Sequence, residues 1–206
     1  MVINTFTHSE ELDDFIPLML DNLAIIEFGV SSGSTLKRTL DKLDQYNKPY
    51  NKIYGFDSWE GLPNTINSEW FASDWQPGSF SAKKGFGVDT VEEVLVKLRN
   101  IIGRDVNFIS GWFKDTLNKE TIEKYEMKQA SYINIDVDIY SSTMEVLQFC
   151  LDNNIIGPGT IIRYDDWTSG PEWVTGNSLA HREIRQKYNI AFDRLSINVF
   201  QYIGKI

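Results

Sequence analysis

Hydrophobic residues in this chain follow two patterns, and segments of the two kinds alternate along the sequence. Nearly continuous apolar runs have the length and composition of buried strands, and they predict strands at residues 23–30, 52–57, 105–110, 131–136 and 159–166. Other segments repeat apolar residues at helical spacing, and they predict helices at 7–22, 31–43, 91–102, 143–153 and 178–188. Alternating strands and helices predict an α/β fold with a mostly parallel sheet covered on both faces.

Local signals refine this outline at the helix starts and at the end of the chain. A Ser or Thr followed three positions later by Glu predicts a capping box, and such pairs are Thr7 with Glu10, Thr90 with Glu93, and Ser142 with Glu145. The last two strands, expected within residues 191–206, have no helix between them. We therefore expect an antiparallel hairpin at one edge of the sheet, within a single domain spanning residues 1–206.

One long segment, residues 60–89, fits neither pattern. It carries several aromatic side chains, namely Trp70, Phe71, Trp75, Phe80 and Phe86. Long irregular segments inside compact domains are usually functional or disordered, and the aromatic content argues against disorder. The sequence predicts either a substrate-facing flap or an interface in a homodimer.

Composition indicates which classes of ligand and which cellular compartment suit this chain. The 206 residues carry a net charge of −9, which disfavours binding to nucleic acid or to anionic membranes and permits cationic ligands and metal ions. Cys150 is the single cysteine, so no disulfide can form within the chain, and a reducing, cytoplasmic environment is expected. We find no apolar run of the ~18 residues that a membrane helix needs, and the first residues do not resemble a secretory signal.

The first strand is followed by a turn, EFGVSSGST, that lacks both common phosphate-binding fingerprints. Glu27 would repel a phosphate and attract an ammonium group, while Gly29, Ser31 and Ser34 form the turn and the start of a helix. This chemistry suits an amino-acid-bearing nucleoside such as S-adenosylmethionine, although an ordinary tight turn is the alternative. Asp57 ends the second strand, where an acidic side chain either accepts hydrogen bonds from ribose hydroxyls or caps a turn.

Four carboxylates follow two later strands. Asp136 and Asp138 end the fourth predicted strand, and Asp165 and Asp166 end the fifth. Since the carboxyl ends of parallel strands meet at one edge of a sheet, these groups would repel one another unless a cation or a shared proton offsets the charge. The residues alone leave a cation site and a shared proton open, and a turn-capping role for Asp165 and Asp166 is the alternative.

Five motifs in this order, IEFGVSSGSTL, YGFDSWEGLP, SGWFKDTL, NIDVDIYSST and GPGTIIRYDDW, resemble the macrocin O-methyltransferase family over roughly residues 20–190. The resemblance implies a Rossmann-like class I methyltransferase fold, with a seven-stranded sheet whose last strand is antiparallel. It also implies an S-adenosylmethionine-dependent and Mg²⁺-dependent O-methyltransferase that acts on a hydroxyl of a sugar or a glycosylated small molecule. Family members that act on antibiotics are longer, so the substrate lid is expected to be reduced or differently built.

The resemblance assigns roles residue by residue. It implies that Asp136, Asp165 and Asp166 bind the metal and that Asp138 is the general base. The residues that it implies at the cofactor are Glu27, Gly29, Ser31, Ser34, Asp57, Ser58, Gly111 and Trp112. Two residues stay without an assigned role: Arg163, which is either paired with an acidic neighbour or turned to the ligand cleft, and His181, which either lies on a helix surface or faces the site.

Two other functions are compatible with the acidic cluster. A metal-dependent hydrolase acting on a phosphoester would use the same carboxylates, but few Lys or Arg residues lie near the motifs to bind phosphate. A non-catalytic relative that binds the cofactor or a partner is the other alternative, and the intact metal and base positions argue against it. The favoured interpretation is an enzyme with a small-molecule acceptor and no nucleic-acid or membrane partner.

Overall fold

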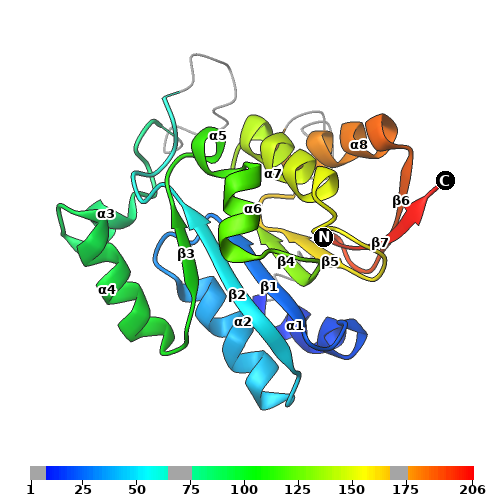
Figure 1. The fold of residues 1–206 in the computed structure, drawn as a ribbon, viewed down its shortest axis with the longest axis horizontal. Helices are drawn as coiled ribbons and strands as arrows, with labels where there is room; N and C mark the ends of the chain where they lie inside the picture. Colours follow the sequence, from blue (N-terminus) through cyan, green and yellow to red (C-terminus); the bar gives the residue numbers. More distant parts are fainter. Residues whose placement is uncertain (1–7, 65–75, 168–175) are drawn as a thin grey trace, which may run out of the picture.

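The computed structural model describes residues 8–64, 76–167 and 176–206, and these residues form one seven-stranded sheet flanked by helices (Figure 1). The strands lie in the order β3-β2-β1-β4-β5-β7-β6. Their bounds are β1 Leu23–Phe28, β2 Tyr50–Asp57, β3 Asn107–Ser110, β4 Ala130–Ile135, β5 Ile161–Tyr164, β6 Ile190–Arg194 and β7 Val199–Lys205. The pairs among β1 to β5 are parallel, and β7 is antiparallel to both β5 and β6.

Helices cover both faces of the sheet, as the strand–helix alternation predicts. One face is covered by α1 His8–Phe15, the 3₁₀ turn η1 Ile16–Leu18, α2 Ser34–Gln45, α3 Ala82–Phe86 and α4 Val91–Ile102. The other face is covered by α5 Phe113–Thr116, α6 Lys119–Tyr125, α7 Tyr140–Asp152 and α8 Gly176–Tyr188. Each face buries its own hydrophobic cluster, and Cys150 on α7 is fully buried in the second of them. None of the helices within the described residues is long and apolar enough to cross a membrane.

The predicted fold class and the terminal hairpin are confirmed, and so is one predicted helix start. Thr90 accepts from the backbone N–H of Glu93 at 3.3 Å, and the Glu93 side chain accepts from the N–H of Thr90 at 3.1 Å. This reciprocal pair is a capping box, which satisfies two donors that the helix itself leaves unpaired. Thr7 lies outside the described residues, as do Trp70, Phe71 and Trp75 of the predicted flap.

Three local predictions are wrong. The helix predicted over 7–22 ends at Phe15 and continues only as η1, because Pro17 lacks an N–H and disfavours helical backbone in the residue before it. The helix assigned to Ser142 starts two residues earlier at Tyr140, and Ser142 lies inside it. Residues 60–89 are not wholly irregular, since α3 forms there with Ser81 as its N-cap.

Two helices that were not predicted, α5 and α6, lie between β3 and β4. Asn118 caps α6 by accepting from the backbone N–H of Thr121 at 2.9 Å. Asn at this position is a recognised helix-start signal, so the capping residue was available in the sequence.

Candidate functional site

The carboxyl ends of five parallel strands meet at one edge of the sheet. Backbone hydrogen bonds continue one residue past the strands: the N–H of Gly111 donates to Asp57, that of Asp136 to Phe28, and that of Asp165 to Ile135. A cavity of about 790 Å³ opens beyond these ends. The strand order reverses between β1 and β4, and open α/β sheets bind their ligands at such a switch point.

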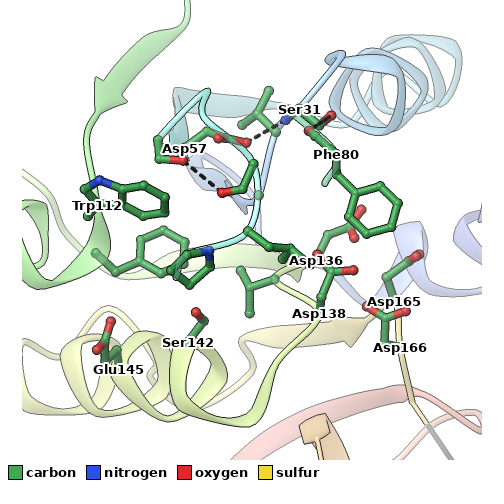
Figure 2. A pocket seen from close by; sticks show the side chains of 18 of the residues that line it. Ser31, Asp57, Phe80, Trp112, Asp136, Asp138, Ser142, Glu145, Asp165 and Asp166 are labelled. Carbon is green, nitrogen blue, oxygen red and sulfur yellow. Dashed lines mark hydrogen bonds between the residues drawn. The ribbon is translucent and has the colours of Figure 1, made fainter. Parts of the chain in front are cut away.

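The cavity gathers nearly all of the predicted site residues (Figure 2). Those that line it are Gly29, Ser31, Ser34, Asp57, Ser58, Gly111, Trp112, Asp136, Asp138, Asp165 and Asp166. Glu27 is the predicted residue that does not line it. The sequence thus located the site, and the roles of its residues stay predictions.

Asp57 is held at the cavity wall by backbone donors. Its Oδ2 accepts from the N–H of Ser31 at 2.7 Å, and its Oδ1 accepts from the N–H of Trp59 at 2.6 Å. These bonds fix the carboxylate in place, and the backbone donors of Val30 and Ser58 also act on it. Burial raises the pKa of Asp57, and the backbone donors act in the opposite direction.

Gly29 allows the turn after β1 to touch the end of β4. A Cβ at this position would lie 1.7 Å from the carbonyl oxygen of Asp136, and the φ of Gly29 is +84°. Both the space and the backbone conformation therefore require glycine. The close approach brings the glycine turn and the first carboxylate of the cluster together.

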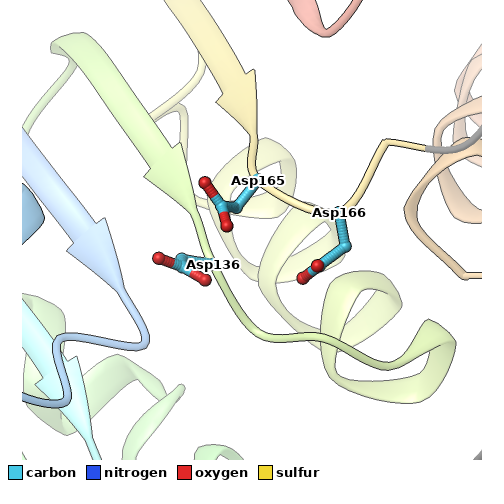
Figure 3. A group of neighbouring side chains, drawn as sticks. All are labelled: Asp136, Asp165 and Asp166. Atoms are coloured by element: carbon cyan, nitrogen blue, oxygen red, sulfur yellow. The ribbon is translucent and has the colours of Figure 1, made fainter. Parts of the chain in front are cut away.

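Asp136, Asp165 and Asp166 converge from the ends of β4 and β5 (Figure 3). One carboxylate oxygen from each lies within 4.8 Å of the others. Burial, followed by the charge of Asp165, raises the pKa of Asp136 well above its ordinary value, and the same causes raise that of Asp166 to about 6. The smaller part of these shifts comes from repulsion among the carboxylates, which a bound cation would relieve.

Asp138 lies two residues beyond Asp136 and also faces the cavity. Its backbone has a φ of +61°, a left-handed conformation that Asp and Asn adopt more readily than most residues. Burial, followed by the charges of Asp166 and Asp165, raises the pKa of Asp138 to about 7. A carboxylate with this pKa accepts a proton readily near neutral pH.

Several lining residues were missed by the sequence analysis. Ser141, Ser142 and Glu145 line the cavity from one face of α7, and Phe80 lines it from the loop before α3. The spacing of the three α7 residues is a helical signal that was available in the sequence. Phe80 adopts a φ of +61°, which no sequence pattern indicated. In Figure 2 its ring lies toward Asp165 and Asp166, whereas Trp112 lies toward Asp57.

Glu27 lies below the cavity in β1 and is 1% exposed. Its Oε2 accepts from the Nδ2 of Asn134 at 3.3 Å, while its Oε1 is buried without a hydrogen-bond partner among the described residues. Burial raises the pKa of Glu27 to about 8. The position does not support a direct place for Glu27 in the cavity wall.

His181 belongs neither to a helix surface nor to the cavity, so both expectations for it are wrong. It is 3% exposed, and its Nδ1 lies 2.9 Å from the hydroxyl of Tyr164. Trp167 and Phe200 contact its ring. Burial, followed by the charges of Arg185 and Arg194, lowers the pKa of His181 to about 3. The side chain is therefore a neutral core residue behind β5.

Comparison with known proteins identifies the family to which the chain belongs. The sequence profile described as macrocin-O-methyltransferase (TylF) matches residues 21–200. The chain belongs to this family. It is also 26% identical over 176 residues to the demethyldecarbamoylnovobiocin O-methyltransferase of Streptomyces niveus, covering 84% of this chain and 62% of that protein. The chain thus spans less than two thirds of the length of this relative.

Solved structures agree on the fold of this family member. Calicheamicin methyltransferase CalS11 superposes with a TM-score of 0.69 at 19% identity, covering 96% of this chain and 76% of that one. The O-methyltransferase NovP superposes with a TM-score of 0.60 at 22% identity, covering 97% and 78%. The seven-stranded sheet is therefore that of the class I methyltransferases.

Proposed function

We propose that the protein is an S-adenosylmethionine-dependent and Mg²⁺-dependent O-methyltransferase acting on a hydroxyl of a sugar or glycosylated small molecule. One observation carries the proposal: a cofactor-type wall, formed by the glycine turn and Asp57, shares a single cavity with Asp136, Asp138, Asp165 and Asp166. Membership of the family supports the reaction class. The similar proteins include a demethyldecarbamoylnovobiocin O-methyltransferase and CalS11, which is a TDP-rhamnose 3'-O-methyltransferase, and the second of these supports a sugar acceptor.

The residues fit the cofactor. The cavity of about 790 Å³ lies in the range of about 300–1,000 Å³ typical of small-molecule sites. Asp57 presents a carboxylate at the cavity wall that suits ribose hydroxyls, and Trp112 offers an aromatic face to the adenine. When bound, S-adenosylmethionine supplies the electrophilic methyl group, while the protein holds the two reactants in line.

The residues fit a magnesium ion as well. The ligand atoms would be carboxylate oxygens of Asp136, Asp165 and Asp166, the type that hard divalent cations prefer. One of them, Oδ2 of Asp166, is buried without a hydrogen-bond partner among the described residues. When bound, Mg²⁺ would lower the pKa of an acceptor hydroxyl.

Asp138 takes the acceptor proton in this scheme. Without a metal its pKa is raised to about 7, and a cation on Asp136, Asp165 and Asp166 would lower that pKa and keep the group ionised. Asp138 lines the same cavity as the metal-binding group. The deprotonated acceptor oxygen would then be able to take the methyl group that bound S-adenosylmethionine supplies, with S-adenosylhomocysteine as the leaving group. Phe80, whose ring lies toward Asp165 and Asp166 (Figure 2), provides an aromatic face for a sugar ring.

A hydrolase acting on phosphoesters is less well supported. Lys114 is the single basic side chain among the described residues that line the cavity, and an acidic wall disfavours a phosphate. The net charge of −9 likewise supports a small-molecule acceptor rather than a nucleic acid or an anionic membrane. The single buried thiol, Cys150, is consistent with a reducing cytoplasmic environment.

Calorimetric titration with S-adenosylhomocysteine, in Mg²⁺ and then in EDTA, tests the proposal. We expect binding in both buffers, loss of binding in Asp57→Ala, and unchanged binding in Asp193→Ala, which alters an exposed aspartate on β6. Turnover of TDP-rhamnose with S-adenosylmethionine should occur in Mg²⁺ and stop in EDTA. An absence of cofactor binding in both buffers would sink the proposal.

A further inference from the structure

Three polar side chains occupy the same level on three neighbouring strands in the middle of the sheet. Glu27 on β1 is in register with Asn134 on β4, which is in register with Arg163 on β5. They are 1%, 0% and 6% exposed. The residues two positions earlier on each strand belong to the hydrophobic cluster on that face. A polar row at a core position costs desolvation free energy, so it needs a compensating interaction.

Hydrogen bonds join this row into a chain that ends at the acidic cluster. Asn134 Nδ2 donates to Glu27 Oε2 at 3.3 Å, and Arg163 Nη1 donates to Asn134 Oδ1 at 3.1 Å. Arg163 Nη1 also donates to Asp165 Oδ1 at 2.8 Å. Because a guanidinium group only donates, the amide of Asn134 must turn its oxygen to Arg163 and its nitrogen to Glu27. The direction of the whole chain is therefore fixed by Arg163.

Asp165 is the member of the metal-binding group that needs such support. Its side chain is 43% exposed, whereas that of Arg163 is 8% exposed. Asp136 and Asp166 repel it, and an exposed aspartate would turn toward water to escape them. A buried guanidinium behind it opposes that motion and leaves carboxylate lone pairs available for a cation.

We propose that Arg163 is a positioning residue for the metal: it holds Asp165 beside Asp136 and Asp166, and it is itself held by Asn134 and Glu27. The inference rests on the proposed Mg²⁺ site. Arg163 does not line the cavity, so it acts on the ligand through Asp165 and touches neither the cofactor nor the acceptor. The buried Glu27, in turn, acts as the far anchor of the chain.

The test measures the affinity for Mn²⁺, a paramagnetic substitute for Mg²⁺, by electron paramagnetic resonance on the whole protein. The variants are Arg163→Met, which removes the charge, and Arg163→Lys, which keeps the charge without the planar fork. Arg99→Met, which alters an exposed arginine on α4, is the control. We expect Mn²⁺ affinity to fall about 10–100-fold in Arg163→Met and less in Arg163→Lys, as for other groups that orient metal ligands.

A second readout separates positioning from general structural damage. S-adenosylhomocysteine affinity should stay within about twofold of the unmodified protein in both variants, since Arg163 lies outside the cavity wall. Unchanged Mn²⁺ affinity in either folded variant overturns the inference, as does an equal loss of both ligands. Arg163→Lys decides the case if Arg163→Met does not fold. Failure of the unmodified protein to bind Mn²⁺ refutes the metal site itself and the inference with it.

Discussion

Acidification should destabilise this protein through His181. The imidazole is 3% exposed, and its Nδ1 pairs with the hydroxyl of Tyr164. Burial lowers its pKa from an ordinary value of 6.5 to about 3, so the folded state keeps it neutral where the unfolded chain protonates it. The unfolded state binds more protons over this interval, and stability is present above pH 6.5 and lost as the pH falls toward 3.

The magnitude follows from the distance to the unfolded pKa. A pH of 5 lies 1.5 units below the pKa of His181 in the unfolded state, which is 6.5, and about 2 units above its pKa in the folded state. Each unit corresponds to ~1.36 kcal/mol, so His181 should reduce the free energy of unfolding by about 2 kcal/mol between neutral pH and pH 5. The buried carboxylates of the cavity have raised pKa values and act with the opposite sign, so the effect must be measured as a difference between variants.

Urea unfolding at pH 5.0, 6.0 and 7.5 provides that difference. His181→Leu removes the titrating group, and we expect the gap between the parent and this variant to shrink by about 2 kcal/mol from pH 7.5 to pH 5. Tyr164→Phe is the matched control, because it removes the hydroxyl partner and leaves the imidazole in place. A gap that is constant with pH in His181→Leu would refute the assignment of a buried neutral histidine.

Three further predictions concern the cavity. Gly29→Ala should cost more than about 2 kcal/mol of stability and abolish S-adenosylhomocysteine binding, because its Cβ would overlap the Asp136 carbonyl. Gly87→Ala is the control: Gly87 has a φ of +63°, and a Cβ there would meet nothing within 4 Å. This variant should cost only about 1 kcal/mol in the same unfolding assay. Asp138→Asn keeps a residue that tolerates the φ of +61°, so kcat should fall about 10²–10⁴-fold while cofactor affinity in calorimetry is unchanged; full turnover would exclude Asp138 as the base. Phe80→Gly relieves a φ of +61°, so the melting temperature should not fall, whereas KM for the acceptor should rise; an unchanged KM would remove Phe80 from the acceptor site.

Much of the cavity could be predicted because parallel strands place their carboxyl ends at one edge. Asp57, Asp136 and Asp165 are far apart in the sequence, yet each follows a predictable apolar strand and each lines the cavity. Predicting the strands is therefore enough to predict that the residues at their carboxyl ends lie close together in the fold. Glycine at position 29 was likewise foreseeable as a turn residue, although the approach of the Asp136 carbonyl was not.

The positions of the other residues depend on tertiary contacts that leave no local pattern in the sequence. Phe80 reaches the cavity through a backbone conformation that its residue type disfavours, held by a bond from the hydroxyl of Ser31 to its carbonyl oxygen at 3.2 Å. His181 occurs in a polar helical segment and is nevertheless buried against Trp167 and Phe200. Arg163 looked out of place in a strand because its partner Asn134 lies on another strand. Such residues become interpretable only when the register of the sheet is known.

The electrostatics of the site link these long-range contacts to its chemistry. A buried arginine without partners would cost several kcal/mol, and so would converging carboxylates without a counter-charge. Placing Arg163 directly behind Asp165 reduces both costs with a single interaction at 2.8 Å. One guanidinium carries a single positive charge, whereas three carboxylates face one another in the cavity. The charge that is left uncompensated is the part that the proposed divalent cation would offset.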